Sequence, residues 1–176
     1  MMRSLRYGLF LLLLAAWLGG ARAADAEKFF DPNFGDFPEE LMAARRAGKQ
    51  GVLLMFEMEN CPYCRRMRQQ VLSRDDVQAY FHKNFAIFSI DTLGSQPITD
   101  FWGKRTTESA YARSLRIAGT PTLIVFGLDG SELVRLNGAA RDVGEFMQFG
   151  RYVVEGRYKK QSPEQFYPAA SSWKRP

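Results

Sequence analysis

The sequence predicts an α/β fold in which one mixed central sheet is flanked by helices, and three observations support this prediction. Two continuous apolar runs, residues 52–56 and 85–90, have strand length and suit strands that are buried on both faces of a parallel sheet. Helical periodicity lies between them, which indicates a right-handed βαβ unit. A third apolar run, residues 122–126, is followed by the turn Leu128-Asp129-Gly130 and a fourth strand over residues 132–136, as in a hairpin.

Helices are predicted before, between and after these strands. Pro38 lies where a first helix begins, because proline fits the first helical turn, and Gly48 lies where that helix ends. Residues 92–105 contain two glycines and a proline and are predicted to be irregular, either a flap over the sheet edge or a loop that contacts a partner. The remaining helices are expected over residues 76–84, capped by Ser73 or Asp75, after Thr106 or Thr107, and after Asp142.

The first 23 residues have the pattern of a secretory signal peptide. Arg3 and Arg6 precede an apolar stretch at residues 8–20, which is shorter than the roughly 20 residues that a membrane-spanning helix needs. The triplet Ala21-Arg22-Ala23 has the small-x-small form of a cleavage site. We therefore expect export and a mature chain that begins near residue 24, with an uncleaved anchor as the alternative.

The rest of the chain is predicted to be a single domain. Residues 24–36 form a lead-in, residues 37–158 carry the predicted strands and helices, and residues 159–176 are a polar C-terminal tail that is expected to be loosely held. Three of the 24 basic residues lie in the signal peptide, so the remainder nearly balances the 19 acidic residues. This balance does not indicate binding to nucleic acid or to a membrane surface, and we expect a monomer.

The two cysteines of the chain lie in Cys61-Pro62-Tyr63-Cys64, between the first buried strand and a helix. Pro62 suits the first turn of that helix. The unpaired N–H groups and the dipole at a helix start lower the pKa of a thiol there. Cys61 is therefore the candidate nucleophilic thiolate, and Cys64 lies one turn behind it.

Three roles other than redox chemistry are open to this cysteine pair, and two of them are disfavoured. A closed structural zinc site needs four ligands, but the chain has no further cysteine and its one histidine is His82. A Cu(I) ion can accept two thiolates, so a copper-binding module remains an alternative. A purely structural disulfide is disfavoured because so short a loop removes little chain entropy. The arrangement strand, Cys-x-x-Cys, helix favours a redox dithiol.

The dithiol unit, followed by Gly119-Thr120-Pro121-Thr122 at the entry to a strand, resembles the thioredoxin superfamily over residues 37–158. The stretch MFEMENCPYC at residues 55–64, the insertion at 92–105 and the stretch RYVVEGRY at 151–158 are similar to secreted thioredoxin-like proteins of the SoxW type. The resemblance implies a thioredoxin-like fold, thiol–disulfide oxidoreductase activity without a cofactor, and a periplasmic location.

The resemblance also implies roles for individual residues. Pro121 matches the family's cis-proline, which lies beside the dithiol and leaves the preceding backbone free to pair with an extended client peptide, and Thr120 holds the position that tunes reactivity. Cytosolic thioredoxins carry a buried aspartate where this chain has Met55. Glu57 and Glu59 are the carboxylates near the strand end, and Glu57 is a candidate for proton transfer, with a solvated or structural role as the alternative.

The expected activity is the reduction of disulfides in client proteins. The Cys61 thiolate attacks a client disulfide, and Cys64 then releases the reduced client. The resemblance implies an electron donor in the inner membrane as a further partner, since glutathione and thioredoxin act in the cytosol. A disulfide isomerase or oxidase on the same fold remains an alternative, as does the non-catalytic Cu(I)-binding module.

Overall fold

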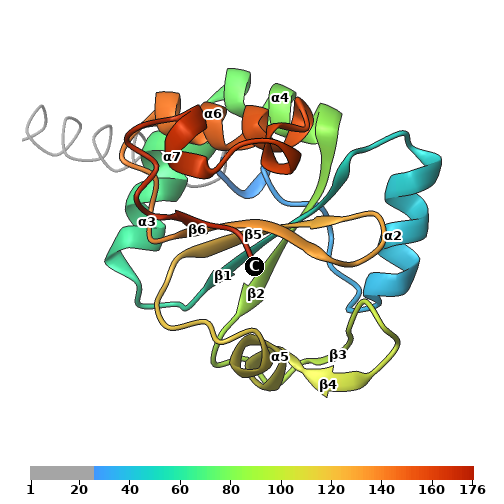
Figure 1. Cartoon of the computed structure of the whole chain (residues 1–176). Helices are drawn as coiled ribbons and strands as arrows, with labels where there is room; N and C mark the ends of the chain where they lie inside the picture. Colours follow the sequence, from blue (N-terminus) through green and yellow to red (C-terminus); the bar gives the residue numbers. More distant parts are fainter. Residues whose placement is uncertain (1–25) are drawn as a thin grey trace, which may run out of the picture.

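A computed structural model describes residues 26–176, so the predicted signal peptide lies outside the described residues. The centre of the protein is a five-stranded sheet with the strand order β2-β1-β5-β6-β7 (Figure 1). Strand β1 is parallel to β2 and antiparallel to β5, and the other neighbouring pairs are antiparallel. The mixed sheet predicted from the sequence is therefore confirmed. The strands are β1 (Gly51–Glu57), β2 (Phe85–Asp91), β5 (Thr122–Gly127), β6 (Glu132–Asn137) and β7 (Trp173–Lys174).

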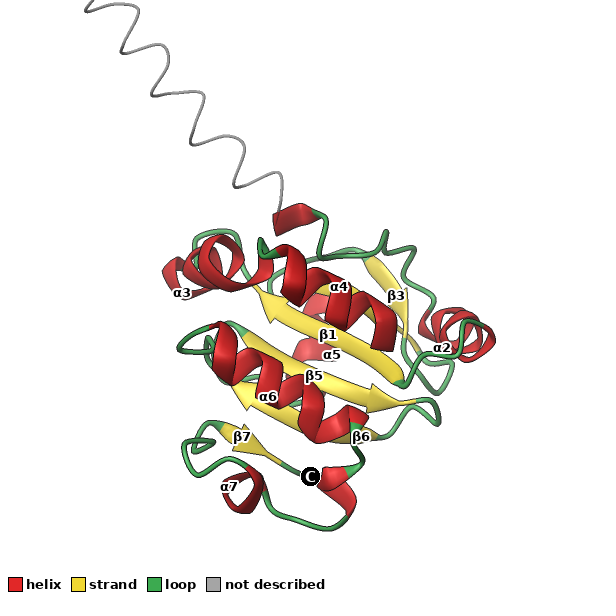
Figure 2. Ribbon diagram, turned by 90° about the horizontal axis from the view of Figure 1, so that it is seen from above, coloured by secondary structure: helices red, strands yellow, loops and turns green. Residues whose placement is uncertain are grey.

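Helices cover both faces of the sheet (Figures 1 and 2). Figure 2 shows α3, α4 and α6 over one face, while α2 and α5 belong to the other side. The helices are α2 (Phe37–Arg46), α3 (Pro62–Met67) with its π-helical continuation η1 (Arg68–Leu72), α4 (Asp75–Asn84), α5 (Glu108–Ser114), α6 (Val143–Val154), the short 3-10 helix η2 (Arg157–Lys159) and α7 (Pro163–Phe166).

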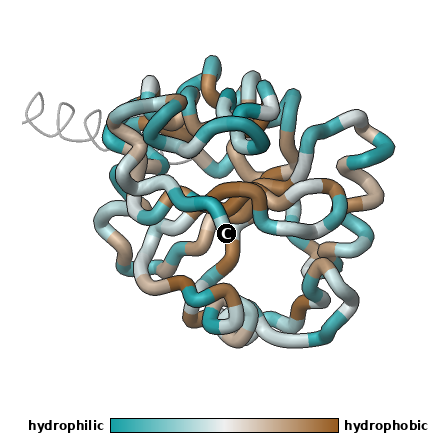
Figure 3. Tube along the Cα trace, in the orientation of Figure 1, coloured by the Kyte–Doolittle hydropathy of each residue, from teal (hydrophilic) through white to brown (hydrophobic). Residues whose placement is uncertain are grey.

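The core has two parts because successive side chains of a strand point to opposite faces. In β1, Leu53 and Met55 join the cluster under α3, α4 and α6, while Leu54 and Phe56 join the cluster under α2 and α5. Six consecutive residues of β1 are buried, which accounts for the continuous apolar run in the sequence. Figure 3 shows the same concentration of apolar residues in the central strands.

Of the helix caps predicted from the sequence, two are confirmed and one is wrong. Thr107 caps α5 and Asp142 caps α6, each by accepting a backbone N–H bond on its side chain. Helix α4 begins after Arg74, whose side chain makes no capping hydrogen bond. The prediction of a cap at Ser73 or Asp75 is therefore wrong, because the helix starts directly at Asp75 and the Ser73 hydroxyl donates back to the preceding helical segment.

The insertion at residues 92–105 is more regular than predicted. Strands β3 (Pro97–Thr99) and β4 (Arg105–Thr107) pair antiparallel as a separate two-stranded sheet. Between them, the buried Phe101 ring lies 4.6 Å from the Phe126 ring and 5.1 Å from the Phe37 ring, measured between centroids. The neighbouring Trp102 is 66% exposed. The insertion is thus anchored to the core by one aromatic ring and presents the next to solvent.

The C-terminal segment is not a loosely held tail, so that prediction is wrong. Strand β7 extends the sheet by pairing with β6, and Trp173 is fully buried. The indole packs against Phe149, Tyr152 and Tyr167 at centroid distances of 5.5, 5.9 and 5.5 Å. The segment is polar in composition, but the buried Trp173 and Ala170 and the pairing of β7 attach it to the core.

The lead-in also packs on the domain. Phe29 is fully buried, and its ring lies 5.8 Å from Phe81 and 6.0 Å from Phe146. The backbone N–H of Asp31 donates to the carbonyl of Ile87 in β2 at 2.7 Å. Within residues 26–176, no helix has both the length and the apolar character needed to cross a membrane.

Candidate active site

Cys61 and Cys64 form a disulfide at the junction of β1 and α3, where the sequence places them. Cys61 is the N-cap residue of α3 and has an extended backbone, and its Sγ accepts a hydrogen bond from the backbone N–H of Cys64 at 3.0 Å. Pro62 occupies the first turn. Both cysteines are almost fully buried, at 2% and 3% exposure.

The loop before β5 lies against the first cysteine. The peptide bond between Thr120 and Pro121 is cis. The carbonyl oxygen of Thr120 lies 3.4 Å from Cys61 Sγ, although the two residues are 59 positions apart in the sequence. The Thr122 hydroxyl donates to the Gly119 carbonyl at 2.7 Å and closes this loop. The structure therefore brings Thr120 and Pro121 to the disulfide.

Two open pockets flank the disulfide. The first, which we call the Tyr63 groove, has a volume of about 440 Å³ and is largely apolar. The Tyr63 ring at its rim is 61% exposed, and the Arg66 guanidinium lies 5.6 Å from the centroid of this ring. The lining of the Tyr63 groove consists of Tyr63, Ala118, Gly119, Thr120, Thr122, Asn137 and Gly138.

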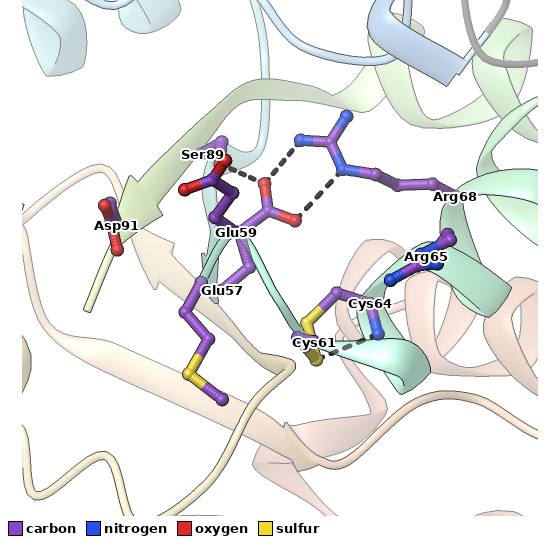
Figure 4. Close-up of a pocket in the computed structure, with 9 residues that line it drawn as sticks. Glu57, Glu59, Cys61, Cys64, Arg65, Arg68, Ser89 and Asp91 are labelled. Atoms are coloured by element: carbon purple, nitrogen blue, oxygen red, sulfur yellow. Dashed lines mark hydrogen bonds and ion pairs between the residues drawn. A yellow bond between two sulfur atoms is a disulfide. The ribbon is translucent and has the colours of Figure 1, made fainter. Parts of the chain in front are cut away.

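The second pocket, of about 360 Å³, is lined by both cysteines and by mostly charged side chains (Figure 4). Glu57 lies in it and is paired rather than solvated. Its carboxylate accepts hydrogen bonds from Arg68 Nε at 3.0 Å, from Arg68 Nη2 and from the Ser89 hydroxyl. Besides Glu57, the lining consists of Met58, Glu59, Cys61, Cys64, Arg65, Arg68, Ser89 and Asp91.

Burial and two neighbouring carboxylates act in opposite directions on the pKa of Arg68. Burial of the Arg68 guanidinium lowers its pKa, but the hydrogen bond and charge of Glu57, together with Glu27, outweigh burial and raise the pKa above the ordinary value. Arg68 is therefore a permanent cation beside the dithiol. Met55, at the position of the usual family acid, is fully buried in the apolar cluster that contains both cysteines.

Sequence reasoning did not identify Arg68 or Ser89. Arg68 follows Arg65 and Arg66 in the same helix, so the sequence alone does not distinguish it from them. Two signals were nevertheless present: a serine interrupts the apolar run of β2, and a glutamate ends the strand β1 that pairs with it. Among residues 26–176, no group of three or more histidine, cysteine, aspartate or glutamate side chains is arranged to hold a metal ion.

A disulfide at a strand–helix junction, a cis-proline beside it and a mixed five-stranded sheet define the class of thioredoxin-fold proteins with a Cys-x-x-Cys disulfide. The model of the family described as thioredoxin-like domain matches residues 37–153, which is more than half of the chain. The chain belongs to this family.

Solved structures agree with the assignment. A thioredoxin from Thermus thermophilus is 31% identical, with a TM-score of 0.53, and the match covers 68% of this chain and 84% of that one. A thioredoxin-fold protein from Helicobacter pylori is 17% identical, with a TM-score of 0.65 and coverage of 84% and 91%. A DsbH oxidoreductase is 16% identical, with a TM-score of 0.53 and coverage of 72% and 87%. No curated protein matches the chain.

Proposed function

We propose that this protein is a periplasmic thiol–disulfide oxidoreductase that reduces disulfides in client proteins. The observation that carries the proposal is the Cys61–Cys64 disulfide, which starts a helix and lies against the Thr120 carbonyl at the edge of an apolar groove. Membership of the thioredoxin-like family supports the same chemistry.

The reaction begins from the reduced dithiol. The Cys61 thiolate attacks one sulfur of a client disulfide, which forms a mixed disulfide and releases the other client sulfur. Cys64 Sγ then bonds to Cys61 Sγ, and the client sulfur leaves with the electron pair and takes up a proton. The 3.0 Å hydrogen bond from the Cys64 N–H to Cys61 Sγ supports this assignment, because a backbone donor stabilises a thiolate at the helix start.

The Tyr63 groove is the proposed client site. An extended client segment would lie along Gly119 and Thr120, next to the cis-proline, and bring its disulfide to Cys61. The exposed Tyr63 ring would contact client side chains on the other side of the groove. This placement follows the role that the family resemblance implies for Pro121 and Thr120.

Export and an electron source complete the proposal. The signal-peptide pattern of residues 1–23 supports a periplasmic location, and the likeness to SoxW-type proteins supports the same compartment. A dithiol there needs a reductant other than the cytosolic glutathione and thioredoxin systems. We assign that role to a protein of the inner membrane that transfers electrons to Cys61–Cys64.

A trapping experiment tests the proposed activity. The Cys64→Ala variant lacks the second thiol and should accumulate mixed disulfides between Cys61 and its clients, which non-reducing gels and mass spectrometry of the adducts would identify. The matched variant with both cysteines replaced by alanine should trap none. A Cys61→Ala variant that captured clients as well as Cys64→Ala would contradict the assignment of Cys61 as the attacking thiol.

A further inference from the structure

Arg68 connects three parts of the chain next to the disulfide. Besides Glu57, its guanidinium contacts Glu27 of the lead-in at 2.7 Å and lies 4.5 Å from the ring centroid of Phe30. The Arg68 side chain is only 19% exposed. It stands at the first position of the π-helical segment η1, and such segments occur frequently at functional sites.

These contacts leave Glu57 with one acceptor site. An ionised carboxylate has about four lone-pair sites. Two hydrogen bonds from Arg68 and one from Ser89 occupy three of them. Oε1 receives two of these bonds and Oε2 receives one, so the remaining site is on Oε2. Figure 4 shows the Glu57–Arg68 pair beside the two cysteines around their common pocket.

We propose that Arg68 is a positioning residue for the resolving step and that the carboxylate it holds, Glu57, accepts the proton of the Cys64 thiol. The inference rests on the proposed function. In this step the Cys64 S–H bond breaks and its proton passes to Glu57. Cys64 Sγ then bonds to Cys61 Sγ, the bond from Cys61 to the client breaks, and the client thiolate receives a proton as Glu57 returns to the carboxylate.

The other charged groups around the pocket do not replace this pair. Glu59, Asp91 and Arg65 line it but are exposed, so water screens their charges from the thiol. Glu27 reaches the pocket only through Arg68. The buried Met55 has no acidic group to offer. Glu57 is thus the described carboxylate of the pocket that is both shielded from solvent and held in place, with a side chain 13% exposed.

Titration of Cys64 tests the charge arrangement without any client. In a Cys61→Ser background, alkylation rate against pH reports the Cys64 thiolate. Glu57→Gln removes a negative charge and should move the titration to lower pH, by roughly one pH unit. Arg68→Met leaves Glu57 unpaired and should move it to higher pH by a similar amount. No shift in either variant, or shifts in the same direction, would show that the pair does not set the charge at Cys64 and would overturn the proposal.

Kinetics of the mixed disulfide test the step itself. Cys61 of the reduced protein is mixed with a peptide disulfide, and formation and decay of the mixed disulfide are followed by rapid acid quench. At a pH below the Cys64 titration, where the thiol must lose its proton during the step, Glu57→Gln should slow the decay by about 100-fold while leaving formation unchanged. Arg68→Met should slow the decay by about 10-fold, and Arg68→Lys should restore part of the rate because it keeps the charge but not the two-point contact.

The pair Glu132–Arg135 is a matched control. Its side chains are 14% and 19% exposed, and Arg135 likewise bonds both oxygens of its carboxylate. Neither residue lines a pocket at the disulfide. Glu132→Gln and Arg135→Met should leave the Cys64 titration and the decay rate unchanged.

The outcomes separate the two proposals. Normal formation of the mixed disulfide with unchanged decay in Glu57→Gln would reject the role of the pair and leave the proposed function intact. A wild-type protein that formed no mixed disulfide would reject both. If Arg68→Met failed to fold, Arg68→Lys and Glu57→Gln would decide the question through the same two measurements.

Discussion

Replacing Trp173 by alanine should destabilise the whole domain, although the residue lies near the C-terminus. Truncating a fully buried aromatic side chain costs about 3–5 kcal/mol, and the indole packs against three aromatic rings. Within the described residues the buried indole N–H has no hydrogen-bond partner. Burial of such an unpaired donor destabilises the folded state by about 1–3 kcal/mol, and truncation removes this penalty. The low end of the range, about 3 kcal/mol, is therefore expected.

Urea unfolding followed by far-UV circular dichroism measures this loss. With a slope of about 2 kcal/mol per molar urea, the midpoint should fall by about 1.5 M. Trp102→Ala is the matched control, because that indole is 66% exposed and its truncation should cost no more than about 0.5 kcal/mol. Equal midpoints for the two variants would show that β7 and Trp173 do not stabilise the fold.

Three further predictions concern the thiol, a buried acid and export. The Cys61 thiol of the reduced protein should titrate one to two pH units below the free value of about 8.5 and below Cys64, as measured by alkylation rate; faster alkylation of Cys64 would reverse their roles. Burial raises the pKa of Glu108 above its ordinary 4.5, opposed in part by backbone N–H groups. Because the native state then binds more protons than the unfolded state, stability should fall as pH rises from about 4.5 through the folded pKa, and Glu108→Gln should remove that component in urea unfolding. An identical pH dependence in the variant would contradict this. Mass spectrometry of periplasmic protein should show a start near Ala24, whereas an intact Met1 would exclude cleavage.

Much of the fold was predictable because its strands have strong local signals. The runs that became β1 and β2 are buried on both faces, so their hydrophobicity is continuous. Strands β3, β4 and β7 have two or three residues each, which is too short to form a recognisable apolar run. The position of Trp173 depends on packing against rings of helix α6 and on pairing of β7 with β6, which a local pattern does not contain.

The dithiol was predictable and its charged pocket was not. Cys61 and Cys64 stand at a strand–helix junction that residue order alone indicates. Glu57 was identified as a carboxylate at the strand end, but its partner was not. Arg68 lies where the α-helix changes to a π-helix, and the β1–β2 register places Ser89 opposite Met55. The local sequence pattern indicates neither feature.

The reduction potential of the Cys61–Cys64 pair tests the central proposal most directly. Stabilisation of the Cys61 thiolate at the helix start favours the reduced dithiol and raises the potential. We expect a potential between roughly −200 and −260 mV, less reducing than cytosolic thioredoxin at about −270 mV but able to reduce strained or exposed disulfides. Equilibration in a glutathione redox buffer, read by thiol trapping, gives the value. A potential near −120 mV, where strong oxidants lie, would contradict the role as a reductase.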